Sequence, residues 1–200
     1  MYDAGMRVAW IALVAGCGFQ SNVPDVGGTG AEIPDSGFDY ALCPTSYNVQ
    51  LPGPSRYRLI ANGHPAWEQS DACNRDLPGA THLVVFETMP ELMAVSAFVD
   101  DPGTTVARNA IWIGAVQLRT AVLASDGWLR FDGAPLIDGW ASGEPNDGTI
   151  EDHGEQFAFL GRTLRYLVDL SGGTDNGALC ECDGKPVAQN ATDAILSNRP

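Results

Sequence analysis

The sequence predicts an α+β fold in which helices and strands occupy separate parts of the chain. One short strand pattern is followed by two helical patterns with a buried strand pattern between them, and after these only strand patterns and loops occur. Grouping of this kind is typical of α+β domains rather than alternating α/β domains. A long turn-rich stretch, residues 133–156, lies between two strand patterns and lacks periodicity. Loops of this length inside a compact domain are usually functional or disordered, so we expect the binding site here.

The first strand and the first helix are predicted from adjacent segments. Residues 57–60 (YRLI) form a short apolar run typical of a strand. In residues 65–76, Pro65 suits a first helical position, and Trp67 and Cys73 follow at helix-compatible spacing. We therefore expect a strand that leads directly into a helix.

The second helix has the clearest signal in the chain. Residues 81–86 (THLVVF) predict a buried strand, and residues 88–99 follow with an apolar face. Thr88 and Glu91 form a capping-box pattern, and Pro90 falls in the first helical turn. Together these residues predict a helix that begins at Thr88.

The remaining elements are predicted to be strands. Residues 111–116 (IWIGAV) indicate a buried strand, and residues 127–133 alternate in the way of a half-exposed strand. Three further short strands are expected after the long loop, at 157–161, 164–170 and 177–182. No element is predicted for the tail, residues 185–200.

Composition narrows the possible functions. The 200 residues are 44% hydrophobic, which allows one domain with a sizeable core. The formal net charge is −14, from 25 acidic and 11 basic residues. Nucleic-acid binding needs a basic surface, so we expect no nucleic-acid partner.

The N-terminal residues predict export. One arginine, Arg7, precedes an apolar run that ends at Cys17 and is too short to span a bilayer. "VAGC" resembles the lipobox of bacterial lipoproteins, which implies a signal peptide over residues 1–16 and lipidation of Cys17. Asp3 departs from the pattern, although a start at Met6 would remove it. The resemblance implies lipid-anchored membrane association, in the outer membrane or on the cell surface of a Gram-negative bacterium. Residues 17–40 suit a flexible tether.

Four cysteines remain if Cys17 is lipidated: Cys43, Cys73, Cys180 and Cys182. In an exported protein an even number predicts two disulfides, for which three pairings exist. Cys180 and Cys182 share one face of an extended strand, so we do not expect them to pair with each other. A zinc site is the alternative, but the spacing contains no C-x-x-C pair.

Several motifs together resemble those of a C-type lectin-like domain, over residues 41–184. In chain order they are AWEQSDAC, THLVVFE, WIGA, GWLRFDG, EPN, LVD and LCE. The resemblance implies a fold of two helices, short antiparallel sheets and a long calcium- and ligand-binding loop. It also implies a Cys73–Cys180 disulfide, which leaves Cys43 and Cys182 to each other. The family's second common disulfide is lost here, with Phe157 near one of its positions and Ser171–Gly172 near the other.

The resemblance further implies a calcium site that binds sugar hydroxyls. The ligands that it assigns in this sequence are Glu144, Asn146, Glu155 and Asp169, with Glu151 as an alternative to Glu155. Carboxylate and amide oxygens are the ligands that calcium prefers. Val168 stands where the family has its second asparagine, so one ligand position is replaced.

The predicted function is therefore calcium-dependent glycan binding of the mannose type, with Glu144, Asn146 and Glu155 contacting the sugar. The alternative is a module that recognises a surface protein, or a structural module with a degenerate calcium site. An enzyme would have to use His153 with neighbouring acids, but the sequence contains no HExxH or GxSxG motif. We expect no catalytic activity.

Overall fold

The computed structural model describes residues 37–146 and 154–199. The predicted signal peptide, the lipidated Cys17 and nearly all of the tether lie outside the described residues. The described residues fall within one compact unit.

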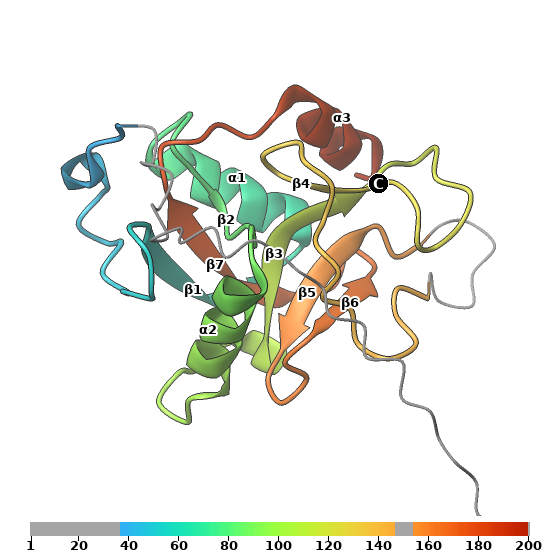
Figure 1. The fold of residues 1–200 in the computed structure, drawn as a ribbon, viewed down its shortest axis with the longest axis horizontal. Helices are drawn as coiled ribbons and strands as arrows, with labels where there is room; N and C mark the ends of the chain where they lie inside the picture. The colour runs from blue at the N-terminus through green and yellow to red at the C-terminus, as the bar shows by residue number, and fades with distance from the viewer. Residues whose placement is uncertain (1–36, 147–153, 200) are drawn as a thin grey trace, which may run out of the picture. The chain divides into compact units, whose positions relative to one another are not determined.

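One mixed sheet of seven strands organises this unit (Figure 1). The strands along its main path run in the order β1-β7-β3-β5-β6, while β2 pairs with β7 and β4 pairs with β3. Only the β3–β7 pairing is parallel among these strands. The strands are β1 (Arg56–His64), β2 (Thr81–Leu83), β3 (Ala110–Gln117), β4 (Trp128–Arg130), β5 (Phe157–Gly161), β6 (Leu167–Leu170) and β7 (Asn176–Cys182).

Both predicted helices are confirmed. The first, α1 (Ala66–Asp76), follows Pro65 directly, and the second is α2 (Met89–Asp100). The Thr88 side chain caps α2 by accepting a hydrogen bond from the Glu91 N–H at 3.4 Å. The Glu91 carboxylate accepts in turn from the N–H of Glu87 at 2.9 Å, one residue earlier than a standard capping box requires. Two short 3₁₀ turns also form, η1 (Tyr40–Leu42) and η2 (Ala107–Asn109).

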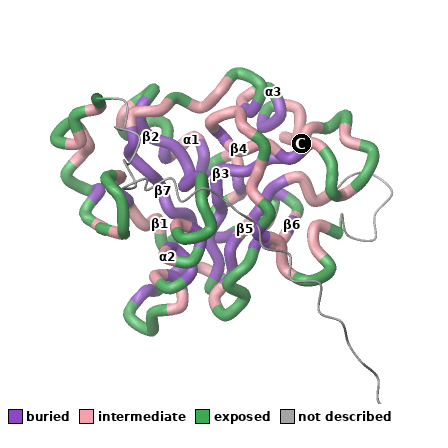
Figure 2. The backbone as a smooth tube through the Cα atoms, in the orientation of Figure 1, coloured by how far each residue is buried: buried purple, intermediate pink, exposed green. Residues whose placement is uncertain are grey.

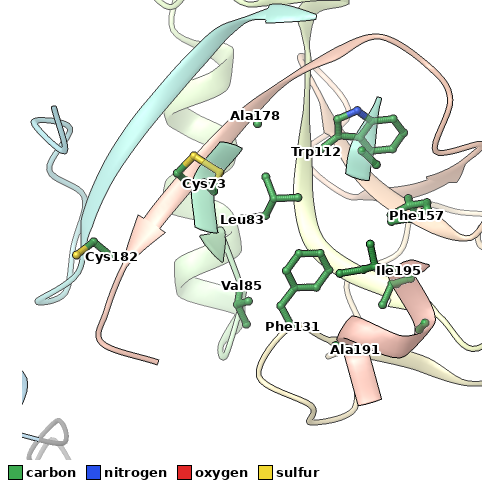
Figure 3. Packing of buried hydrophobic residues seen from close by; sticks show 14 of the residues in the cluster. Cys73, Leu83, Val85, Trp112, Phe131, Phe157, Ala178, Cys182, Ala191 and Ile195 are labelled. Atoms are coloured by element: carbon green, nitrogen blue, oxygen red, sulfur yellow. A yellow bond between two sulfur atoms is a disulfide. The ribbon is translucent and has the colours of Figure 1, made fainter. Parts of the chain in front are cut away.

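A third helix, α3 (Gln189–Ser197), forms in the tail, where the sequence predicted no element. Its buried residues are Ala191, Ala194 and Ile195, and they belong to the same core cluster as Phe131. Figure 3 shows Ala191 and Ile195 beside Phe131. The tail therefore contributes to the core of the domain.

The core lies on both faces of the sheet (Figure 2). Successive residues of β3 point to opposite faces, so Trp112 joins one cluster while Ile111 and Ile113 join the other. The Trp112 cluster includes residues of α1 and α3, and the second cluster includes residues of α2. All eight residues of β3 are buried, which confirms the predicted central strand.

Two disulfides join distant parts of the chain, Cys73–Cys180 and Cys43–Cys182. These are the pairings that the resemblance implies. Cys180 and Cys182 both lie on β7, which pairs with β1 so that Arg56 faces Cys182. The Cys73–Cys180 disulfide fastens α1 to β7 (Figure 3). The Cys43–Cys182 disulfide fastens the segment before β1 to the same strand.

Phe157 and Gly172 are in contact where the family's other disulfide would lie. A Cβ atom on Gly172 would be 2.4 Å from the Phe157 ring and 3.0 Å from the Trp67 ring. The Phe157 ring also lies edge-on to Trp67, with 6.3 Å between ring centroids. Aromatic packing against a bare backbone therefore joins β5 to the segment after β6, in place of a covalent bond.

Candidate functional site

The long loop is fastened to the edge strand β6 just before the predicted calcium ligands. Trp140 forms an isolated parallel bridge with Leu167. The Ala141 N–H donates to the Leu167 carbonyl at 2.9 Å, and the Leu167 N–H donates to the Gly139 carbonyl at 2.8 Å. These bonds hold the loop beside β6, so residues 144–146 come to lie next to Asp169.

Glu144, Asn146 and Asp169 meet at this point. The backbone N–H of Asn146 lies 3.1 Å from each carboxylate oxygen of Asp169 and donates to both. The Asn146 side-chain amide donates to Glu144 Oε2 at 2.7 Å. Between Glu144 and Asn146 the chain passes through Pro145 with a cis peptide bond. Asp169 is only 2% exposed, whereas Asn146 is exposed, so the cluster opens to solvent from a buried base.

Carboxylates crowd together in this cluster. Partial burial raises the pKa of Glu144, and a hydrogen bond with Asp169, together with the charges of Asp169 and Glu155, raises it further to about 7. The hydrogen bond from Asn146 opposes this shift. A pKa raised by neighbouring carboxylates means that the site favours a positive species among them, either a proton or a metal cation.

The donor set fits calcium. Glu144, Glu155 and Asp169 offer carboxylate oxygens and Asn146 offers an amide oxygen, and hard cations bind such oxygen ligands. Glu155 lies two residues before the start of β5 and is half-buried. Its negative charge helps to raise the pKa of Glu144. These four residues are the ones that would hold the ion.

One position of the site carries no ligand. Val168 lies on β6, where it pairs with Phe159, next to Asp169. Its isopropyl group has no oxygen to offer. The alternative ligand Glu151 lies outside the described residues, as do His153 and the other two acids of the loop, Asp147 and Asp152.

The tryptophans divide into core and surface residues. Trp112 is 0% exposed and Trp128 is 6% exposed, so both belong to the core, as expected. Trp140 is half-buried and packs edge-on against Trp128, with 4.7 Å between the ring centroids. Only Trp140 of these three presents an accessible ring.

A second group of ionisable side chains is buried elsewhere in the sheet, around the end of β7. His82, Glu181 and Asp183 are each less than 5% exposed, and one potential ligand atom of each lies within 4.8 Å of the others. His82 Nδ1 donates to the Leu83 carbonyl at 2.8 Å, and Nε2 lies 3.0 Å from Asp183 Oδ1. The Val85 N–H donates to Glu181 at 3.0 Å. Because both ring nitrogens already have partners, we assign this group to an internal ion pair.

The sequence identified only part of this buried group. It placed His82 in the predicted strand at residues 81–86, where the ring bonds to the neighbouring Leu83 carbonyl. The partnership with Asp183, 101 residues away, was missed. Its signal in the sequence is the pair of acids, Glu181 and Asp183, that alternate with two cysteines in CECD at the end of a predicted strand.

The ion pair shifts the pKa values of its members. Burial alone would lower the pKa of His82, but the hydrogen bond and charge of Asp183 outweigh burial and raise that pKa to about 9. Burial raises the pKa of Glu181 to about 7, although the charge of His82 opposes this. Burial alone would raise the pKa of Asp183, but the hydrogen bond and charge of His82 keep that pKa below its ordinary value.

We predict that stability falls as pH rises through the neutral range. The folded state binds more protons than the unfolded state, at His82 between pH 6.5 and about 9 and at Glu181 between pH 4.5 and about 7. The His82 contribution is therefore complete below pH 6.5 and is lost above about pH 9. Urea unfolding of the wild type and of His82→Gln across this range measures the effect. The variant should lose the slope above pH 6.5; an unchanged slope would mean that His82 does not carry it.

No helix among the described residues is long and apolar enough to cross a membrane.

Comparison with solved structures identifies the fold. The mouse scavenger receptor C-type lectin carbohydrate-recognition domain superposes with a TM-score of 0.57 at 21% identity, covering 70% of this chain and 98% of that one. The C-type lectin CEL-I from Cucumaria echinata gives 0.55 at 17% identity, over 70% and 96%. A calcium-independent type II antifreeze protein gives 0.54 at 16% identity, over 71% and 95%. No family model and no curated sequence matches the chain. The chain therefore has the C-type lectin-like fold, as its motifs imply.

Proposed function

We propose that this C-type lectin-like chain is a calcium-dependent carbohydrate-binding module. The observation that carries the proposal is the meeting of Glu144, Asn146 and Asp169, with the Glu155 charge acting on the same carboxyl. Lectin-like neighbours described as carbohydrate-recognition domains support it at the level of the fold.

The residues of the site have distinct roles in this proposal. Asp169 is buried and fixed by two contacts with the Asn146 N–H, so it forms the rigid base of the site. Glu144 and Asn146 stand at the solvent side, where they can both hold the ion and exchange hydrogen bonds with vicinal sugar hydroxyls. Bound calcium would supply two further coordination positions for those hydroxyls.

Val168 limits the affinity that we expect. One oxygen ligand and one sugar hydrogen bond are missing compared with the family pattern, and a single hydrogen bond contributes about 0.5–1.5 kcal/mol. Extracellular calcium modules often bind with dissociation constants of about 10⁻⁴–10⁻³ M. We therefore place this site at the weak end of that range, and the sugar preference in the mannose class of the EPN motif.

The second candidate function is recognition of a surface protein, or a structural role, with a degenerate calcium site. Val168 favours it, and so does the similarity to an antifreeze protein described as calcium-independent. The same fold hosts many binding functions, so the fold alone does not select a sugar ligand.

The proposed location is outside the cytoplasm. Two disulfides in a chain of this size suit an oxidising compartment. Combined with the lipobox-like VAGC, this supports a lipoprotein anchored through Cys17, either in the outer membrane or on the cell surface of a Gram-negative bacterium.

A glycan array probed with residues 37–200, once in millimolar calcium and once in chelator, tests the function. Binding to mannose-type glycans that chelator abolishes is the expected result. The double variant Glu144→Gln and Asn146→Asp should weaken or redirect this binding without loss of folding, because both side chains lie towards solvent. Chelator-insensitive binding to a protein partner would favour the second candidate instead.

A further inference from the structure

A cleft lies on the surface beside the half-buried Trp140. It has a volume of about 450 Å³, within the range of small-molecule sites. Its walls combine aromatic and apolar side chains with a hydroxyl and two carboxylates. The main lining residues are Ser125, Asp126, Trp128, Leu136, Asp138 and Trp140.

Both walls of the cleft are held in place by hydrogen bonds. The buried Gln117 Nε2 lies within hydrogen-bond distance, 3.0–3.1 Å, of three carbonyls in and beside the first wall, those of Leu123, Ala124 and Asp126, and its two N–H groups are shared among them. The Trp128 indole N–H also donates to the Ala124 carbonyl, at 2.8 Å. A site of this kind is formed before any ligand arrives, which reduces the ordering cost of binding.

The second wall is pinned against β4. The Leu136 N–H donates to the Trp128 carbonyl at 3.2 Å, and Pro135 forms a bridge with Leu129. Trp140 is fixed from behind by its contact with Trp128 and by its bridge to Leu167. The accessible part of the Trp140 ring therefore has a fixed position in the cleft.

The cleft adjoins the carboxylate cluster. Trp140 pairs with Leu167, and Asp169 lies two residues further along the same strand, a distance of about 7 Å at the rise of a β-strand. Three residues of loop separate Trp140 from Glu144, and the Glu144 N–H donates back to the Ala141 carbonyl at 3.0 Å. Two linked sugar rings cover a separation of this size.

The chemistry of the lining selects a neutral, hydroxyl-rich ligand. Asp126 and Asp138 are exposed and accept hydrogen bonds, so they repel anions and suit hydroxyl donors. None of the described residues that line the cleft is basic. The Trp140 ring offers an apolar face to the C–H face of a sugar ring, as amphipathic aromatic rings do at binding sites.

We propose that this cleft is a second sugar subsite. The ligand is then an oligosaccharide: one of its sugars binds at the calcium site, and the adjacent sugar stacks on Trp140. The inference rests on the proposed function and extends it from a monosaccharide to a linked pair of sugars. Asp126 and Asp138 bind the hydroxyls of the second sugar, and Trp140 determines where its ring lies.

Calorimetric titration compares methyl α-mannoside with the α1–2, α1–3 and α1–6 linked mannobioses in millimolar calcium. At least one mannobiose should bind about three- to tenfold more tightly than the monosaccharide, the gain expected from one or two added polar contacts. The double variant Asp126→Ala and Asp138→Ala should remove that gain and leave monosaccharide binding unchanged, because both side chains are exposed and lie outside the calcium cluster. Trp140→Leu should act in the same direction.

The control is Asp175→Ala, which removes an exposed acid that does not line the cleft. It should change neither ligand's affinity. If the mannobioses bind no more tightly than methyl α-mannoside, or if the double variant keeps the full gain, the second subsite is refuted and the proposed function stands. If neither sugar binds, both the subsite and the proposed sugar function are refuted.

Discussion

Replacing Cys73 and Cys180 together by alanine is expected to lower the free energy of unfolding by about 3–4 kcal/mol while the other disulfide remains. Taken alone, the bond closes a loop with a sequence separation of 107 residues. When the Cys43–Cys182 disulfide is in place, a shorter covalent path already joins Cys73 to Cys180. This path runs along the chain from Cys73 to Cys43, crosses the disulfide to Cys182 and continues to Cys180. That path covers about 32 residues (73 − 43 plus 182 − 180), and the chain-entropy model scales with the logarithm of loop length.

The two disulfides should therefore depend on each other. Removing either pair costs about 3–4 kcal/mol, whereas removing both costs about 8 kcal/mol, which exceeds the stability of many small domains. Urea unfolding of the two double variants and of the quadruple variant measures this. Double variants that lose less than about 1 kcal/mol would show that the crosslinks do not limit the entropy of the unfolded chain.

The second large effect is expected at the calcium site. Asp169→Asn should weaken calcium binding by about 100-fold or more, because it removes the charge of the buried ligand at the base of the site. In chelator the same variant should be as stable as the wild type, or more stable. The asparagine keeps the shape of the side chain and can donate a hydrogen bond to Glu144, whose pKa is raised by the Asp169 carboxylate.

Calcium titration followed by calorimetry compares Asp169→Asn with Asp175→Asn, which changes an exposed acid outside the site. The control should bind calcium like the wild type. Retention of wild-type affinity in Asp169→Asn would show that the ion, if bound, is held elsewhere in the chain.

The elements with a local signal were predicted correctly from the sequence. The cap formed by Thr88 fixes the start of α2, and the apolar run of β5 gives its bounds of Phe157–Gly161. Both depend on residues that are adjacent in the chain. The strand that was predicted from aromatic alternation, residues 127–133, is shorter, because only Trp128–Arg130 pair with β3.

Helix α3 was missed because its helical pattern is short and its cap is weak. Its N-cap residue, Ala188, has no side chain that could accept a hydrogen bond. Three small or branched apolar residues at Ala191, Ala194 and Ile195 form its buried stripe, and this spacing was the available signal. The helix is stabilised by tertiary contacts with Phe131 and its neighbours, which a local pattern does not contain.

The candidate site was predicted in part. The resemblance named Glu144, Asn146 and Asp169, which the structure brings together, although 23 residues separate the last two. Sequence alone could not show that Glu144 and Asp169 share a hydrogen bond, because this depends on the bridge between Trp140 and Leu167. Nor could the sequence reveal the cleft, because Gln117 fixes one of its walls and β4 fixes the other through contacts between distant segments.

The melting temperature of residues 37–200 in calcium and in chelator tests the central claim most directly. A ligand that binds only the folded state stabilises it, by about 1–3 kcal/mol when calcium is present at 10 to 100 times its dissociation constant. At a dissociation constant of about 10⁻³ M, about 10 mM calcium is in tenfold excess, so we expect the melting temperature of a domain of this size to rise by roughly 3–6 °C. The rise should disappear in Asp169→Asn. An identical melting temperature of the wild type in calcium and in chelator would contradict a calcium site at Glu144, Asn146, Glu155 and Asp169.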